Sequence, residues 1–308
     1  MAADLSAEPH SSAWFIAQRD FWFHADYLEL LRARLGLGGV RAVLDVGAGI
    51  GHWTQLVATL LAPEAAVTGL ERDPRSVARA GERLAGGDLD TRVRFVPGVA
   101  EQLPFADGAF DLVTCQTLML HVADAPAVIA EMRRVTRPGG TVLLSEPNNA
   151  AGLMVTTSAD ADRPVAERLE QIGFYLTCVR GKAALGEGDE AVADLLPGHL
   201  ARAGLEEVRC FVNDRTDLLV DSYASPAEQA LRAAILDGAR DGTWVWPRAD
   251  AERYFTAGGG DPAHFAIGWQ RRVDEARTTA DALGAGRLDT AGAAVHYLIS
   301  ARRPAVGS

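Results

Sequence analysis

Short apolar runs alternate with helical stretches over the first half of the chain. Five of these runs have the length and composition of strands that are buried on both faces of a parallel sheet. They fall at 43–46, 66–70, 93–96, 111–115 and 141–145. Between them, apolar residues recur at helical spacing at 53–61, 74–84 and 124–136. This alternation of strands and helices predicts an α/β fold with a parallel sheet.

The pattern becomes mostly helical after residue 150. The stretches 151–202 and 222–286 have helical periodicity that is interrupted by glycine-rich turns. Residues 207–220 alternate well enough to predict one long strand, and 293–301 predict a last strand. Near the N-terminus, residues 13–35 predict one or two unusually aromatic helices. Their aromatic side chains either pack against the sheet or form a lid that walls a binding site.

Three glycines follow the first strand at alternate positions, as Gly47, Gly49 and Gly51. Glycine accepts positive φ and has no Cβ, so a ligand can lie directly against the backbone there. A strand, a glycine turn and a helix N-terminus also attract an anionic group, because free N–H groups and the helix dipole point at it. His52 stands where the dinucleotide fingerprint G-x-G-x-x-G has its third glycine, which disfavours a nicotinamide oxidoreductase.

The run from Asp45 to Gly51 resembles motif I of class I S-adenosylmethionine (SAM)-dependent methyltransferases, D-x-G-x-G-x-G. The blocks 98–105 (GVAEQLPF) and 107–111 (DGAFD) resemble the G-D-A-x-x-L-P-F…F-D pattern of the ubiquinone/menaquinone-type subfamily. A Pro-Gly-Gly turn at 138–140 precedes the fifth strand, as is typical of these enzymes. The resemblance covers about residues 40 to 150 and places these blocks in the expected order.

The resemblance implies a Rossmann-like α/β fold with a seven-stranded sheet. In that fold strands six and seven form an antiparallel hairpin, and here the long helical stretches are expected as cap insertions. We therefore expect six segments along the chain. They are a helical lid at 1–37, the SAM-binding core at 38–150, a cap insertion at 151–195, a core helix and strand six at 196–221, a second cap insertion at 222–290 and strand seven at 291–303.

The resemblance also implies SAM as the cofactor and S-adenosylhomocysteine as its product. Glu71 lies 20 positions beyond Gly51, at the tip of the second strand, where an acid can accept hydrogen bonds from both ribose hydroxyls. Val99 replaces the aspartate that contacts the adenine amino group in the family, so Glu101 or the N–H of Ala100 is expected to hold the adenine instead. The expected cofactor-binding residues are Asp45, Gly47, Ala48, Gly49, Gly51, Glu71, Arg72, Ala100, Glu101 and Gln116.

Methyl transfer requires an acceptor atom held in line behind the sulfonium methyl group, with water excluded. A base is needed in addition if the acceptor is a hydroxyl. His121, in the loop after the fourth strand, is the first candidate, and Glu146, after the fifth strand, is the second. A loop histidine bonded to backbone is the plain alternative for His121. The side chains expected to contact the acceptor are Trp14, Trp22, Tyr27, Asn148 and Tyr175.

Composition narrows the expected acceptor to a small, partly apolar metabolite. The net charge is −11 and the sequence has no basic stripe, which argues against nucleic acid as a partner. The three scattered cysteines lack metal-ligand spacing, so we expect no metal and a reducing cytoplasm. Lys182 is the only lysine and arginine carries the rest of the positive charge, which is typical of a GC-rich bacterial genome. The sequence has no apolar run of transmembrane length and no signal-peptide pattern. It leaves open whether the protein is a monomer or a homodimer.

The acceptor expected from these features is a natural-product or quinone-type intermediate. The alternative is a SAM-binding protein of the same fold without methyl transfer, namely a cyclase, a decarboxylase or a regulator. Release of S-adenosylhomocysteine over a panel of acceptors distinguishes the two.

Overall fold

The structure is a computed structural model that describes residues 19, 21–220, 222–241, 245–292 and 295–305. Contacts within the chain divide it into two compact units, each assembled from three segments of sequence. We call them the sheet unit (23–148, 191–214 and 296–308) and the helical unit (1–22, 149–190 and 215–295).

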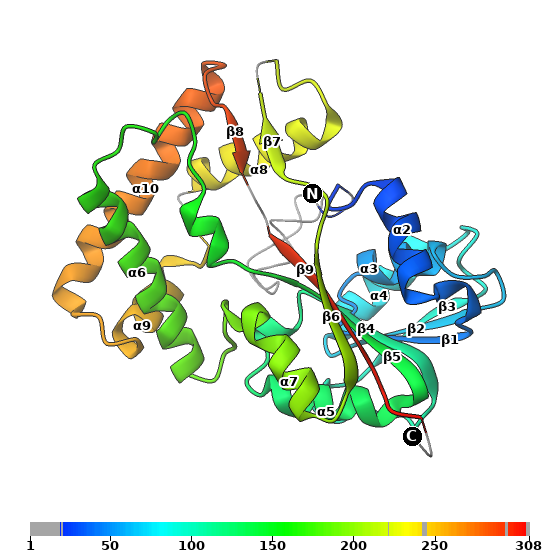
Figure 1. The fold of residues 1–308 in the computed structure, drawn as a ribbon. Coiled ribbons are helices and arrows are strands. Elements are labelled where there is room, and N and C mark those ends of the chain that lie inside the picture. Colours follow the sequence, from blue (N-terminus) through cyan, green and yellow to red (C-terminus); the bar gives the residue numbers. More distant parts are fainter. Residues whose placement is uncertain (1–18, 20, 221, 242–244, 293–294, 306–308) are drawn as a thin grey trace. The chain divides into compact units, whose positions relative to one another are not determined.

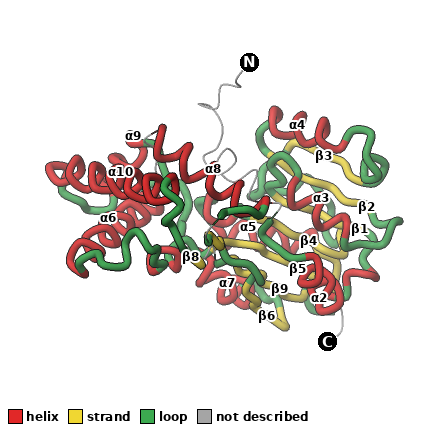
Figure 2. The backbone as a smooth tube through the Cα atoms, turned by 90° about the horizontal axis from the view of Figure 1, so that it is seen from above, coloured by secondary structure: helices red, strands yellow, loops and turns green. Residues whose placement is uncertain are grey.

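The sheet unit is built on one seven-stranded sheet with the order β3-β2-β1-β4-β5-β9-β6 (Figures 1 and 2). The first five strands in the chain pair in parallel, and β9 is antiparallel to both β5 and β6. The predicted Rossmann-like sheet with a final antiparallel pair is therefore confirmed. The strands are β1 (Ala42–Val46), β2 (Ala66–Glu71), β3 (Val93–Pro97), β4 (Phe110–Gln116), β5 (Thr136–Pro147), β6 (Glu206–Val212) and β9 (His296–Arg302).

Helices cover both faces of this sheet. In Figure 1, α5 (Ala125–Val135) and α7 (Leu196–Arg202) lie on one face, while α2 (Ala25–Leu35), α3 (His52–Thr59) and α4 (Pro74–Leu84) lie on the other. Aspartate caps begin two of them: Asp73 accepts from the N–H of Arg75 at 3.2 Å in α4, and Asp124 accepts from Ala127 at 2.9 Å in α5. A proline follows in the first turn of each helix, where its missing N–H costs nothing.

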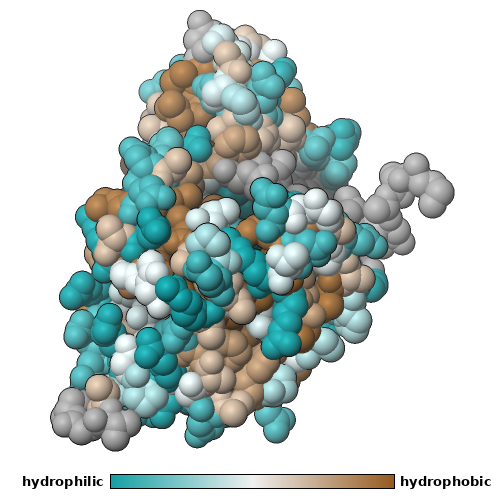
Figure 3. All heavy atoms as spheres, turned by 90° about the vertical axis from the view of Figure 1, so that its right-hand side faces the viewer, coloured by the Kyte–Doolittle hydropathy of each residue, from teal (hydrophilic) through white to brown (hydrophobic). Residues whose placement is uncertain are grey.

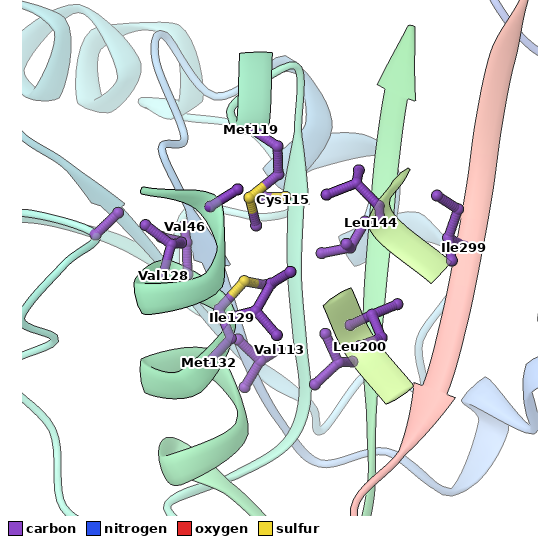
Figure 4. Packing of buried hydrophobic residues seen from close by; sticks show 14 of the residues in the cluster. Val46, Val113, Cys115, Met119, Val128, Ile129, Met132, Leu144, Leu200 and Ile299 are labelled. Atoms are coloured by element: carbon purple, nitrogen blue, oxygen red, sulfur yellow. The ribbon is translucent and has the colours of Figure 1, made fainter. Parts of the chain in front are cut away.

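A core cluster of buried side chains lies between the sheet and the helices α5 and α7 (Figure 4). Its side chains come from the central strands and from both helices, so it fixes the strand ends that carry the candidate site. The labelled members are Val46, Val113, Cys115, Met119, Val128, Ile129, Met132, Leu144, Leu200 and Ile299.

The helical unit consists of α6 (Val165–Ala184), α8 (Pro226–Asp241), α9 (Arg248–Ala257), α10 (Pro262–Gly284) and a hairpin of β7 (Asp217–Leu219) with β8 (Thr290–Gly292). Helices α6 and α9 cross very closely. A Cβ on Gly181 would lie 1.6 Å from the carbonyl oxygen of Tyr254, and one on Gly258 would lie 1.9 Å from that of Thr177. Glycine is therefore required at both positions. Short 3₁₀ turns complete the two units at η2 (Leu37–Gly39), η3 (Met119–His121), η4 (Ala151–Met154) and η5 (Val192–Leu195).

One expected element differs from the structure, and another is described only in part. The predicted strand 207–220 is wrong, because β6 ends at Val212 and β7 pairs with β8 in a separate sheet. Asn213 ends the ladder by accepting from the N–H of His296 with its side-chain oxygen at 2.9 Å. Of the predicted helical region 13–35, the structure describes α2, and Trp14 lies outside the described residues.

Within the described ranges, no helix is long and apolar enough to cross a membrane. Figure 3 shows one face of the molecule, on which groups of hydrophobic residues are interrupted by hydrophilic ones. Exposed apolar residues of this kind are ordinary on the surface of a folded protein.

Candidate functional site

The glycine turn after β1 has left-handed backbone at all three glycines, with φ of 72° at Gly47, 54° at Gly49 and 85° at Gly51. The N–H groups of Gly47 and Ala48 donate to the carbonyl oxygen of Leu70 at 2.8 and 2.9 Å, which joins the turn to the end of β2. Only glycine adopts such a series of φ angles without strain.

The three glycines differ in what faces them. A Cβ on Gly47 would lie 2.7 Å from Cδ1 of Leu118, and one on Gly51 would lie 2.7 Å from Cζ of Phe95. A Cβ on Gly49 would meet no atom within 4 Å. Gly47 and Gly51 therefore allow close packing, whereas Gly49 leaves the middle of the turn open. This open backbone fits a ligand that lies directly on the turn.

Glu71 links the turn to the end of β2. Its Oε2 accepts from the N–H of Gly49 at 2.9 Å, and its Oε1 accepts from the N–H of Asp73 at 3.0 Å. An ionised carboxylate has about four acceptor positions, so each oxygen retains a lone pair. Glu71 is partly exposed and can therefore accept from two ribose hydroxyls while it continues to hold the turn.

Asp45 lies beneath the turn and is 1% exposed. Its Oδ2 accepts from the hydroxyl of Thr54 at 2.5 Å, and the indole of Trp53 donates to Thr114 at 2.9 Å. These bonds fasten the first turn of α3 to β1 and β4. Asp45 thus supports the glycine turn from beneath.

At the expected adenine end, Val99 is 47% exposed and forms an isolated antiparallel bridge with Gln102. Ala100 is buried and Glu101 is exposed, as is Arg72 after β2. The side chains of Glu101 and Arg72 are therefore available to a ligand, whereas Ala100 can offer only its backbone.

The L-P-F and F-D blocks have structural roles that sequence reasoning missed. Glu131 of α5 accepts from the N–H of Leu103 at 2.8 Å, and Arg134 donates to the carbonyl oxygens of Leu103 and Phe105 at 2.9 and 2.8 Å. Asp111 accepts from two consecutive N–H groups, including that of Ala42 at the start of β1. These blocks fix the loop after β3 and the entry to β1.

Glu146 is completely buried at the end of β5. Its Oε1 accepts from the N–H groups of Leu118 at 2.8 Å and Met119 at 3.1 Å, and from the thiol of Cys115 at 3.4 Å. Burial raises the pKa of Glu146 to about 7, against the opposing effect of these backbone bonds. Its Oε2 is buried without a hydrogen-bond partner among the described residues. The carboxyl group thus faces the loop after β4 and not solvent.

That loop begins with a strained residue and ends at His121. Thr117 has φ of 54°, and its N–H donates to the carbonyl oxygen of Ser145 at 2.9 Å. His121 is half-buried at the end of η3, and Gln116 is buried as the last residue of β4. The structure therefore brings Gln116, His121 and Glu146 to the carboxyl edge of β4 and β5, where ligands bind in open α/β sheets.

The residues expected to contact the acceptor are distributed over both units. In the sheet unit, Asn148 donates to Asp194 at 2.9 Å and to the hydroxyl of Tyr297 at 3.2 Å. Tyr27 donates to the carbonyl oxygen of Val212 at 2.8 Å. In the helical unit, Trp22 is 9% exposed.

Tyr175 belongs to the aromatic core of the helical unit. It stacks on Trp246 with ring centroids 5.4 Å apart, and burial raises the pKa of its phenol. A fully packed tyrosine of this kind has little surface left for a ligand. Within the described part of the chain, no group of three or more His, Cys, Asp or Glu side chains is arranged to hold a metal ion.

The comparisons with known proteins agree with this geometry. Residues 44–144, which include the glycine turn, match the family described as a methyltransferase domain. This segment is similar to methyltransferase domains of the type found in quinone biosynthesis, a class of enzymes whose cofactor is SAM.

Two curated bacterial relatives are similar to the chain. It is 30% identical to 27-O-demethylrifamycin SV methyltransferase of Amycolatopsis mediterranei over 190 residues, which are 62% of this chain and 65% of the relative. It is 35% identical to demethylmenaquinone methyltransferase of Listeria monocytogenes over 124 residues, which are 39% of this chain and 50% of the relative. The chain thus spans between half and two thirds of the length of these relatives.

Among solved structures, the [4+2]-cyclase SpnF has the same fold. It superposes with a TM-score of 0.51 at 22% identity, over 91% of this chain and 81% of that one. This likeness concerns the fold alone.

Proposed function

We propose that the protein is a SAM-dependent methyltransferase that acts on a small, partly apolar metabolite. The observation that carries the proposal is the open backbone at Gly49, with the carboxylate of Glu71 bound to its N–H. Two of its relatives are named for a rifamycin and a menaquinone precursor, which supports a natural-product or quinone-type acceptor. The net charge of −11 and the three free cysteines support an enzyme of the bacterial cytoplasm that does not act on nucleic acid.

The turn and the ends of β2 and β3 fit the three parts of SAM. The methionine part fits the open backbone at Gly49, the ribose fits the carboxylate of Glu71, and the adenine fits the backbone of Ala100 beside Glu101. When bound, the cofactor supplies a methyl group that is activated by a sulfonium. The remaining task of the chain is to orient an acceptor and to exclude water.

His121 is proposed as the base for a hydroxyl acceptor. It ends η3 at the carboxyl edge of the sheet, and an imidazole can take the hydroxyl proton near neutral pH. Glu146 is proposed as a positioning residue, because its carboxyl group is buried and binds two N–H groups of the loop that carries His121.

The test is methyl transfer from SAM to a panel of hydroxylated naphthalenes, quinols and macrolactones, measured by release of S-adenosylhomocysteine. We expect turnover with at least one class and its loss in the Glu71→Ala variant. Tight binding of S-adenosylhomocysteine without methylation of any acceptor would contradict the proposal. That result would favour a non-methylating function such as that of the cyclase with the same fold.

A further inference from the structure

The sheet unit contains a pocket of about 120 Å³ that lies apart from the glycine turn. Thr141 of β5 and Arg302 of β9 are paired beside this pocket, whereas Pro147 pairs with His296 at the other end of the same ladder. Since β5 and β1 run in the same direction, the pocket and the turn lie at opposite edges of the sheet. The polar residues that line the pocket are Arg34, Thr141, Glu207, Arg209, Ser300 and Arg302.

Three of these residues are arginines, and they come from three different elements. Arg209 lies on β6, Arg302 ends β9, and Arg34 lies in the last turn of α2. The guanidinium of Arg34 lies 5.1 Å from the ring centre of Phe211, which holds it beside β6. None of the three arginine side chains donates a hydrogen bond to any residue that the structure describes. Their planar groups of N–H donors match the oxygens of a phosphate or a carboxylate.

The pocket contains one acid, Glu207, which is paired only loosely. Its Oε2 lies 3.6 Å from Nη2 of Arg209 and 3.9 Å from Nε of Arg302. A charge-assisted hydrogen bond is shorter, at about 2.7–2.9 Å. Glu207 also has φ of 50° at the bulge where the pairing of β6 with β9 shifts. Three positive charges thus face one negative charge, in a chain whose net charge is −11.

Two buried hydroxyl residues line the same pocket. Ser300 is 4% exposed and Thr141 is 9% exposed. Within the described ranges, neither side chain makes a hydrogen bond. A hydroxyl can donate to an anion that the arginines attract, and it regains there the bonding that burial has removed.

We propose that this pocket binds a phosphoryl group, with the guanidinium groups of Arg34, Arg209 and Arg302 and the hydroxyl of Ser300 donating to its oxygens. A phosphate dianion balances three cations and one carboxylate better than a single carboxylate does. The volume is below the range of roughly 300–1,000 Å³ typical of drug-sized ligands, which fits one small anionic group. SAM contains no phosphate, and the inference does not rest on the proposed function.

The test is calorimetric titration of the full chain with inorganic phosphate at pH 8 and constant ionic strength. Acetate is the monoanionic probe. We expect one saturable phosphate site per chain and at least tenfold weaker binding of acetate. Glycerol 3-phosphate distinguishes two sources of the group: tighter binding than that of inorganic phosphate identifies a phosphate monoester as the ligand, and weaker binding identifies free phosphate. Equal affinity for phosphate and acetate would overturn the proposal.

Three kinds of variant test the residues of the pocket. Arg209→Gln and Arg302→Gln should each lower the affinity for phosphate about tenfold, because each removes charge-assisted hydrogen bonds. Ser300→Ala should lower it severalfold with no change of charge. Glu207→Gln should raise it severalfold, because the competing carboxylate is removed.

Arg277→Gln is the charge-matched control. Arg277 lies on α10 with its side chain 63% exposed and does not line the pocket, so phosphate affinity should stay unchanged. If Arg277→Gln weakens phosphate binding as much as Arg209→Gln, the binding reflects overall charge and the proposed site is wrong.

Titration with S-adenosylhomocysteine separates this inference from the proposed function. Every variant of the pocket should bind S-adenosylhomocysteine as the wild type does, which also shows that it is folded. Phosphate binding that ignores Arg209 and Arg302 in such folded variants would overturn the phosphoryl site and leave the methyltransferase proposal standing. Absence of S-adenosylhomocysteine binding in a wild type that binds phosphate would overturn only the methyltransferase proposal.

Discussion

Removing the buried carboxyl group of Glu146 should change how stability depends on pH. Its pKa is about 7 in the folded protein against about 4.5 in the unfolded chain, so the folded state holds the proton more tightly. Stability from this group is fully present below about pH 4.5 and is lost as pH rises to about 7. A difference of about 2.5 pKa units corresponds to about 3 kcal/mol.

Glu146→Gln removes the titration and retains a carbonyl oxygen for the N–H groups of Leu118 and Met119. Urea unfolding of both proteins at pH 5 and pH 7.5 gives the difference in unfolding free energy at each pH. The other titrating groups contribute equally to the unfolding free energy of both proteins, so their contributions cancel in this difference. We expect the wild type to lose about 2 kcal/mol relative to Glu146→Gln between the two pH values, because part of the full effect is already lost at pH 5. A difference that is the same at both pH values would refute the reasoning.

Glu146 should also stabilise the loop that follows β4. Glu146→Leu leaves two N–H groups without an acceptor, at about 1–3 kcal/mol each, so unfolding should require about 2–6 kcal/mol less than in Glu146→Gln. In turnover, Glu146→Leu should lower kcat while the affinity for S-adenosylhomocysteine is kept, and Glu146→Gln should restore most of it. Ser145→Ala is the neighbouring control. If Gln and Leu lower kcat equally, the carboxyl group takes part in the chemistry and is not a positioning residue.

Three further variants test other parts of the account. Gly51→Val should destabilise the fold, because its side chain would collide with Phe95, and thermal unfolding at the wild-type temperature would contradict this. Asp111→Ala removes the acceptor of two N–H groups and should cost about 1–3 kcal/mol in urea unfolding, so an unchanged midpoint would show that Asp111 does not hold β1. His121→Ala should lower kcat roughly 10²–10⁴-fold with cofactor affinity kept, and full activity with a wild-type pH profile would remove it from the mechanism.

The parallel half of the fold could be predicted because its signals are local. Strands buried on both faces are continuous apolar runs, and Asp73 before Pro74 marks a helix start by its own chemistry. The break of the strand after Val212 could not be predicted, because the side chain of Asn213 ends the ladder by bonding to His296, which is 83 positions away. Alternation of apolar residues does not report such a long-range bond.

The sequence predicts where the glycine turn of the site lies, but it does not predict which side chains pack around that turn. Glycine spacing located the turn, yet which glycine faces open space depends on Leu118 and Phe95, which come from other elements. The position of Glu146 after the fifth strand makes it a candidate base in the sequence. Its burial against the next loop is a consequence of tertiary packing that the sequence around it does not carry.

The central claim is that the turn at Gly49 binds SAM, and calorimetric titration with S-adenosylhomocysteine tests it most directly. The wild type should bind with one site per chain. Gly49→Val should abolish binding in a folded protein, because its side chain fills the open face of the turn, and Glu71→Ala should weaken binding about tenfold to a hundredfold. Wild-type affinity in a folded Gly49→Val variant would contradict the account.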